Sequence, residues 1–189
     1  MYAAARDYRA GAISIYLKAG AADGAAVTYM KGELANLMQS AGVTLEWLDA
    51  SAGIPGVQDS QLVVLELEGA CGPRSVVPPG SSSGPLASTA ASDGHILPFS
   101  AVHCNVLNQM LGPAIAGESA RRRDWLYGRA LARIAAHEIY HVLTEAAGHS
   151  TGGIAKQAFS ARDLLAGRFE FEGPALAKLR TAVMPAGAF

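Results

Sequence analysis

Two histidines and a glutamate stand close together in the sequence, as His137, Glu138 and His141. On an α-helix, residues four apart share one face, so both imidazoles can reach a single cation about 2.0–2.1 Å from each nitrogen. Zinc in such a site lowers the pKa of a bound water to about 7 and polarises a carbonyl group. A glutamate beside the first ligand can take a proton from that water and return it to a leaving amine. This His-Glu-x-x-His spacing therefore predicts zinc-assisted hydrolysis with Glu138 as the general base.

A catalytic zinc site needs a third protein ligand besides the two histidines and a water. We predict His149, which directly follows Gly148, a residue at which the chain can fold back under the end of the helix. Glu145 remains an alternative because it continues the face of the motif histidines at i+4. Asp163 is a further alternative.

The motif lies in the most strongly patterned segment of the chain. From about Ser119 to Ala147, apolar residues recur at i, i+4, i+5 and i+8, which predicts a long amphipathic helix. Gly148 is placed to end this helix in a left-handed cap. The competing interpretation is a helix whose histidines are exposed or satisfied in the core, and whose Glu138 pairs with Arg129 or Arg133.

Shorter patterns elsewhere predict a sheet with helices. We expect strands over residues 13–18, 43–48 and 62–67, with a helix over 25–39 between the first two. A loop should cover 51–60. Residues 72–94 are rich in Ser, Pro and Gly and are predicted to form a long loop. His95 to Val102 is predicted to be a strand at a sheet edge, because Pro98 cannot donate to a central ladder. Further helices are expected over 105–111, 161–166 and 174–183.

These elements predict one α+β domain over residues 1–189, an α/β-type sandwich with a twisted mixed sheet. The chain of 189 residues is 50% hydrophobic and 16% charged, too apolar for a disordered protein. Its net charge of −1 provides no strong field for DNA or RNA, so we expect no nucleic-acid partner. No uninterrupted apolar run reaches about 18 residues, so we expect no membrane span.

The two cysteines, Cys71 and Cys104, rule out a disulfide-dense scaffold. They leave two alternatives open, one disulfide bridge or two buried free thiols. The first seven residues do not form a signal peptide. We expect a secreted or periplasmic protein if such a peptide has been removed, and a cytoplasmic one otherwise. His95 and His103 are interpreted as structural residues.

Three runs around the motif resemble the metzincin clan of zinc metallopeptidases, the matrixin-like members most, and also small bacterial zincin-like proteins. They are His137 to Leu143, Gly148-His149-Ser150-Thr151 and Gly153-Ile154-Ala155-Lys156. The resemblance implies His137, His141 and His149 as zinc ligands and Glu138 as general base. It also implies a zincin-like fold with an N-terminal lobe over about 1–148 and a small C-terminal lobe over about 149–189. This fold would have a long active-site helix, a C-terminal helix and an antiparallel edge strand that binds extended substrate, matched here by His95 to Val102.

The sequence departs from the metzincin pattern at two places. The spacing to the third histidine is two residues longer than usual, and the glycine directly precedes His149. The family's methionine beneath the metal is replaced by Ala155.

We therefore expect a zinc metalloendopeptidase with one catalytic Zn²⁺ ion and a peptide or protein substrate. The alternative, prompted by Ala155, is a zincin-fold metal-binding protein that acts as a binding module with little or no proteolytic turnover. A third interpretation is an interaction domain whose histidines never meet. The oligomeric state is left open.

Overall fold

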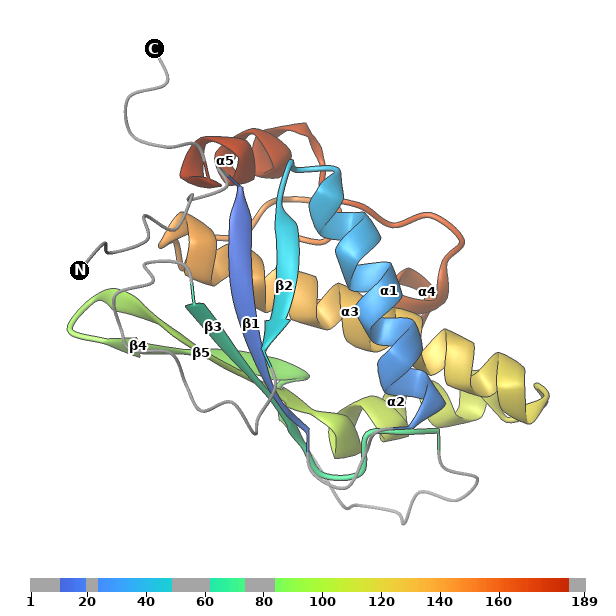
Figure 1. Cartoon of the computed structure of the whole chain (residues 1–189). Coiled ribbons are helices and arrows are strands. Elements are labelled where there is room, and N and C mark those ends of the chain that lie inside the picture. The colour runs from blue at the N-terminus through green and yellow to red at the C-terminus, as the bar shows by residue number, and fades with distance from the viewer. Residues whose placement is uncertain (1–10, 20–23, 49–61, 74–83, 184–189) are drawn as a thin grey trace, which may run out of the picture.

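The computed structural model describes residues 11–19, 24–48, 62–73 and 84–183. The loop expected over 51–60 lies outside these residues. In chain order the elements are β1 (Ala12–Ala19), α1 (Ala25–Gln39), β2 (Thr44–Leu48), β3 (Leu62–Glu68), β4 (Ala87–Ser92), β5 (His95–His103), α2 (Cys104–Ile115), α3 (Ala120–Thr144), α4 (Ala161–Leu165) and α5 (Gly173–Val183) (Figure 1).

The strands form one mixed five-stranded sheet in the order β2-β1-β3-β5-β4. β1 runs parallel to β2 and β3, and β3 runs parallel to β5. β4 alone runs antiparallel to its neighbour, β5, and lies at the edge. The predicted mixed sheet is therefore confirmed, within a mixed α/β fold, and the antiparallel strand at its edge is β4.

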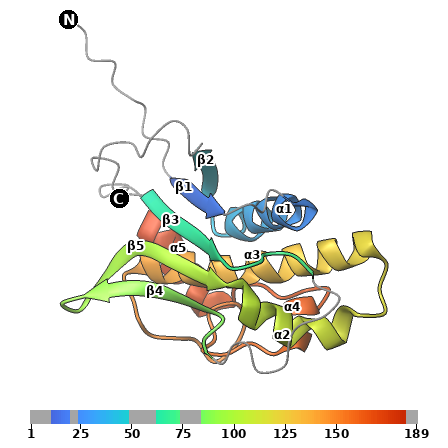
Figure 2. The ribbon, with the colours of Figure 1, turned by 90° about the horizontal axis from the view of Figure 1, so that it is seen from below.

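The core lies between the sheet and the two longest helices. Alternate side chains of β1 and β3 are buried, among them Ile13, Ile15, Val63 and Leu65. This alternation is what a strand with one covered face requires. α1 and α3 pack against each other beside the sheet (Figure 2).

Gly128 lies where α3 crosses α1. A Cβ atom at this position would overlap the carbonyl oxygen of Ala26 and lie 2.6 Å from the Cβ of Tyr29. Only glycine therefore permits this close approach of the two helices. A helical glycine costs about 1 kcal/mol relative to alanine, and the close packing offsets that cost here.

The predicted loop over 72–94 is partly wrong, because residues 87–92 form β4. This strand consists of Ala, Ser and Thr, so it lacks the alternation of large apolar and polar residues by which a strand is recognised. β4 owes its conformation to the antiparallel ladder with β5 rather than to a local apolar pattern.

The prediction that His95 to Val102 lies at the sheet edge is also wrong, because β5 lies between β3 and β4. Pro98 is tolerated there because the β4–β5 register shifts between the pair Thr89/Ser100 and the pair Ala91/Ile96. The ladder with β3 begins only at Phe99. Pro98 therefore sits in an irregular stretch where the missing N–H breaks no ladder hydrogen bond.

The predicted end of α3 is wrong by three residues, since the helix stops at Thr144. Glu145, not Gly148, adopts the left-handed conformation, with φ of 48°. The chain must leave the helix this early because the carbonyl of Ala146 turns back to the ring of His141. At the other end, the side chain of Ser119 caps the helix as an acceptor.

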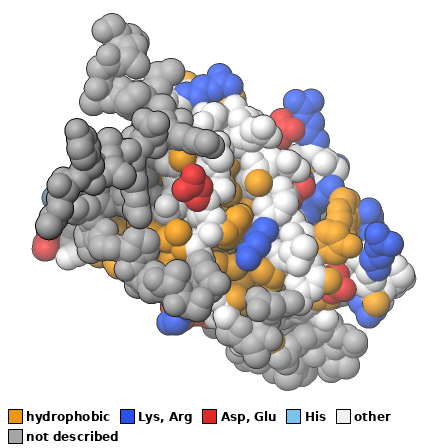
Figure 3. Space-filling model, viewed as in Figure 1, with side chains coloured by type: hydrophobic (Ala, Val, Ile, Leu, Met, Phe, Trp, Pro, Cys, Tyr) orange, Lys and Arg blue, Asp and Glu red, His pale blue; other side chains and the backbone are white. Residues whose placement is uncertain are grey.

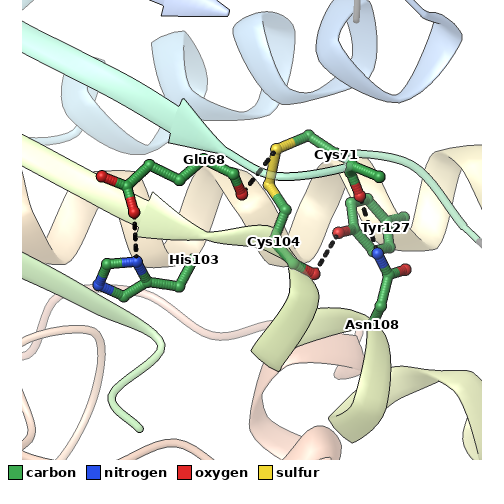
Figure 4. Close-up of a disulfide and its surroundings, with 7 residues drawn as sticks. Glu68, Cys71, His103, Cys104, Asn108 and Tyr127 are labelled. Carbon is green, nitrogen blue, oxygen red and sulfur yellow. Dashed lines mark hydrogen bonds and ion pairs between the residues drawn. A yellow bond between two sulfur atoms is a disulfide. The ribbon is translucent and has the colours of Figure 1, made fainter. Parts of the chain in front are cut away.

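Cys71 and Cys104 form a disulfide, which settles the alternative left open by the sequence. The bond joins the segment after β3 to the first residue of α2 (Figure 4). Asn108 of α2 also donates to the carbonyl of Ala70 at 2.8 Å. α2 is thereby fixed to the sheet by one covalent and one polar link. Nearby, His103 pairs with Glu68 at 2.8 Å, as expected of a structural histidine.

None of the helices in the described residues is long and apolar enough to cross a membrane. On the face shown in Figure 3, Lys and Arg side chains lie at several separate places among acidic and neutral ones. The described part of this face therefore presents no continuous basic surface.

Candidate metal centre

α3 positions the motif residues on the side of the helix that faces the molecule's interior. His137, Glu138 and His141 are each no more than 7% exposed. The two histidines lie one turn apart, and their Nε2 atoms are 3.0 Å from each other. The helix therefore brings the two imidazoles together as the i, i+4 spacing predicts.

Backbone carbonyls hold the other nitrogen of each ring. His137 Nδ1 lies 2.7 Å from the carbonyl oxygen of Ile154, and His141 Nδ1 lies 2.6 Å from that of Ala146. A carbonyl oxygen can only accept, so both Nδ1 atoms carry the proton in these hydrogen bonds. A neutral ring protonated at Nδ1 presents an Nε2 lone pair. This arrangement around histidine is typical of metal ligands.

The Nε2 atoms of the two rings lie close together, a contact that a cation bound between them would satisfy. Burial lowers the pKa of His137 to about 4, a shift that its hydrogen bond to the Ile154 carbonyl only partly opposes, so this ring is neutral near pH 7. Two tetrahedral zinc ligands with bonds of about 2.0–2.1 Å place their nitrogens about 3.4 Å apart. The observed 3.0 Å separation is close to that value. The donor atoms thus fit a metal ion bound between them.

His149 completes the cluster from the segment that follows α3. Its ring stacks on that of His137 with centroids 5.3 Å apart, and lies 4.8 Å from the ring of His141. One ligand atom from each of the three histidines lies within 4.8 Å of the others. His149 is exposed, unlike the other two, although partial burial still lowers its pKa. The structure thus gathers all three predicted histidines into a cluster that could hold a metal ion.

The two alternative third ligands lie outside this cluster. Glu145 occupies the left-handed position at the end of α3 and does not continue the histidine face. Asp163 is engaged by Lys156 Nζ at 2.7 Å and by the hydroxyl of Ser160 at 2.6 Å. Those contacts tie α4 to the preceding loop.

A tight turn over residues 153–156 supplies the carbonyl that binds His137. Lys156 N lies 3.3 Å from the carbonyl oxygen of Gly153, whose φ is 63°. Within the turn, Ile154 and Ala155 are completely buried. The backbone N–H of Ile154 donates to the carbonyl of Glu170 at 3.0 Å, which ties the turn to the C-terminal segment. Ala155 therefore lies in a buried turn that contacts the site.

Glu138 has its partner on the edge strand and not among the arginines. Its Oε2 accepts a hydrogen bond from Thr89 Oγ1 at 2.6 Å. Burial raises the pKa of Glu138, while the bond from Thr89 acts in the opposite direction. Arg129 and Arg133 instead approach Glu33, at 3.6 and 3.7 Å. The alternative in which Glu138 pairs with one of these arginines is therefore wrong.

No protein-family model matches the chain, and no curated protein is significantly similar to it.

A pocket of about 540 Å³ opens beside the three histidines and Glu138. β4 forms one wall through residues such as Ala87 and Thr89, and Met110 and Ile134 contribute apolar surface. Phe159 is a further lining residue and packs edge-on against His137, with centroids 5.2 Å apart. The motif atoms thus face a space large enough for part of a substrate.

Several site residues were not predicted from the sequence. Thr89 lies in a segment that was expected to be a loop. Ser100, which lies behind Thr89, belongs to no motif recognised in the sequence. Phe159 and Gln157 also line the pocket, from a segment after the third histidine that has no helical or strand periodicity. Only the proximity of 157–159 to the predicted ligand His149 could have suggested a role. Tyr140, which lies within the motif, is buried.

Proposed function

We propose that this protein is a zinc-dependent peptidase with a metzincin-like arrangement of its site. The observation that carries the proposal is the close approach of the Nε2 atoms of His137 and His141, joined by His149 and flanked by a buried carboxylate beside a pocket. Three imidazoles leave the fourth position of a tetrahedral ion open, as in catalytic rather than structural zinc sites.

Zinc is the metal that the donor set favours. Imidazole ligands suit zinc, copper, iron and nickel, whereas the hard cations Mg²⁺ and Ca²⁺ prefer oxygen ligands. Bound here, zinc would supply an activated water and a Lewis acid for a carbonyl group.

Glu138 is the group that moves the proton. Thr89 engages Oε2, so Oε1 is the oxygen that takes up a proton and returns it to the leaving nitrogen. Burial favours the protonated carboxyl, and the hydrogen bond from Thr89 favours the ionised form. This balance suits a group that must both accept and release a proton near neutral pH.

The edge of the sheet supports a peptide as the substrate. β4 pairs only with β5 among the described strands, so its other side can form a ladder with an added strand. Extended peptides bind in this way to exposed sheet edges. Since β4 also lines the pocket beside Glu138, a peptide paired there would pass the site. The edge strand of the resemblance is thus matched by β4 rather than by residues 95–102.

Other features support a metzincin-like site. α3 supplies the motif, and the buried turn at residues 153–156 lies against the first motif histidine. The turn that carries the family's methionine is thus matched in position, although here it carries Ala155.

The disulfide between Cys71 and Cys104 supports a place for the protein in an oxidising compartment, where such bonds persist. Blocking free thiols in protein taken from its native source, before denaturation, tests this point. Unmodified cysteines support the proposal, and alkylated cysteines contradict it.

Metal analysis and one substitution test the proposed function. Protein purified without chelator should contain one zinc per chain and cleave members of a broad peptide library. Glu138→Gln should keep the zinc and lower kcat/KM by about 10²- to 10⁴-fold, because the general base is lost. Glu118→Gln, a change at an exposed glutamate outside the pocket, is the matched control. Absence of stoichiometric transition metal would refute the proposal.

The second candidate, a metal-binding module with little turnover, is favoured by one observation, Ala155 in the buried turn. The same library separates the two functions. A zinc-loaded protein that cleaves nothing supports the binding module.

A further inference from the structure

Thr89 connects the edge strand to the Glu138 carboxylate. Its hydroxyl lies 2.6 Å from Glu138 Oε2, within the short range typical of a hydroxyl bound to a carboxylate. No other side-chain hydrogen bond to Glu138 is present within the described residues. The two residues are 49 positions apart in the sequence, so this contact exists only because β4 lies along α3.

Ser100 lies behind Thr89 and gives the hydrogen bonds a direction. Ser100 Oγ is 2.9 Å from Thr89 Oγ1, and Ser100 is only 4% exposed. A threonine hydroxyl has a single proton, and an ionised carboxylate can only accept. Thr89 therefore donates to Glu138, and Ser100 donates to Thr89.

The strand register keeps this pair in place. Thr89 lies directly opposite Ser100 in the β4–β5 ladder, so their side chains share one face of the sheet. The register shift begins only after this pair, towards Ala91 and Ile96. The irregular stretch around Pro98 thus leaves the Thr89–Ser100 pair in regular ladder geometry.

We propose that Thr89 is the positioning residue for Glu138, with Ser100 supporting its hydroxyl. This inference rests on the proposed function, in which Glu138 moves the proton. A glutamate side chain has three rotatable bonds, so burial alone does not fix the orientation of its carboxylate. A displacement of about 1 Å at a reacting group can cost about 10²-fold in rate. The Thr89 hydroxyl fixes one carboxylate oxygen and leaves the other for the proton.

Two substitutions at residue 89 test the hydroxyl separately from the shape of the side chain. With zinc-loaded protein and a cleaved peptide, Thr89→Val should lower kcat by about 10- to 100-fold, with KM within about two-fold and zinc content unchanged. Thr89→Ser keeps the hydroxyl and should restore kcat to within about three-fold of the original protein. Ser100→Ala should cause a smaller loss than Thr89→Val. Ser92→Ala, an exposed change elsewhere on β4, should have no effect.

Two outcomes of the kinetic experiment would overturn the inference. One is a Thr89→Val protein with unchanged kcat. The other is an equal loss in Thr89→Ser, which would mean that the shape of the side chain and not its hydroxyl matters.

A thermal double-mutant cycle in the metal-free protein keeps this inference distinct from the proposed function. Tm is measured in chelator for Thr89→Val, for Glu138→Ala and for both together. If the hydroxyl binds the carboxylate, Thr89→Val should shift Tm less than half as much when residue 138 is already alanine. Additive shifts overturn the inference even in an active peptidase. Coupled shifts in a protein that cleaves no peptide support the contact and refute only the proposed function.

Discussion

The metal centre has two halves that differ in how they are held. The half on α3, formed by His137, Glu138 and His141, is buried and each side chain has a hydrogen-bond partner. The half from the segment after α3 places His149 at the surface, and no hydrogen bond within the described residues holds its ring. The helical half is therefore preorganised, whereas His149 owes its position to the path of its loop and to its ring contacts with His137 and His141. We expect the first half to determine whether metal binds and the second to adjust how tightly.

The largest expected effect is at the helical half. His137→Ala removes a buried ligand and leaves the Ile154 carbonyl without its donor. Loss of a mere outer partner of a metal ligand already costs about 10- to 100-fold in affinity. The variant should therefore bind zinc at least about 100-fold more weakly, as measured by competition with a chromogenic chelator. Affinity within a few-fold of the original protein would contradict a metal site at this histidine.

The matching change in the loop half, His149→Ala, should lower zinc affinity less than His137→Ala does. His149→Ala removes an exposed ligand that water can replace, so we expect zinc affinity to fall by at least about ten-fold but by less than in His137→Ala. The same chelator competition, run beside His137→Ala, makes the comparison direct. His103→Ala, a change at a histidine paired with Glu68 outside the pocket, is the control. Equal losses for His137→Ala and His149→Ala would show that the two halves are held alike.

The rigidity of the helical half depends on the packing of α3 against α1. Gly128→Ala would force its Cβ onto the backbone of Ala26, and overpacking of this kind costs about 1–3 kcal/mol. Gly32→Ala in α1 has no atom within 4 Å of the new Cβ and should stabilise by about 0.5–1 kcal/mol. Urea denaturation of the metal-free proteins measures both. A Gly128→Ala protein as stable as the original would contradict the close helix contact.

The smallest expected effect is the pH-dependent stabilisation of the fold by Asp163, which binds Lys156 and Ser160 beyond the loop half. Burial raises the pKa of Asp163, but hydrogen bonds from Lys156 and Ser160 outweigh it and lower that pKa to about 2. A carboxylate with a depressed pKa stabilises the fold above its unfolded pKa of about 3.9. That contribution is lost as pH falls from about 4 towards 2.

Asp163→Asn should therefore cost about 1 kcal/mol at pH 6, the scale of a partly exposed ion pair. The difference in unfolding free energy between the two proteins should shrink as pH falls through this range. A difference that stays constant with pH would contradict the ionised contact.

The sequence predicted the helical half well because its signals are local. The i, i+4 spacing places both histidines on one face whatever the rest of the fold does. The apolar period then shows that this face is buried. His149 could also be predicted, from its place beyond a helix stop and from the resemblance.

The parts that were missed depend on contacts between distant residues. β4 has no apolar alternation of its own, and Thr89 reaches Glu138 only through the pairing of β4 with β5. The edge position predicted from Pro98 was wrong because the prediction assumed a regular ladder, whereas the β4–β5 ladder is interrupted around that residue. Gly148 was the best local candidate for the helix cap, but the return of the Ala146 carbonyl to His141 moved the cap to Glu145.

The bond between Cys71 and Cys104 turns the intervening chain, with a separation of 33 residues, into a closed covalent ring. Both β4 and β5 belong to that ring. Closing a loop of this length reduces the entropy of the unfolded chain by the equivalent of about 3–4 kcal/mol. If β4 separated from β5, the disulfide would still hold the two ends of the loop that contains both strands close together. The pocket wall formed by β4 therefore lies within a covalently closed loop, and reduction of the disulfide should lower the free energy of unfolding.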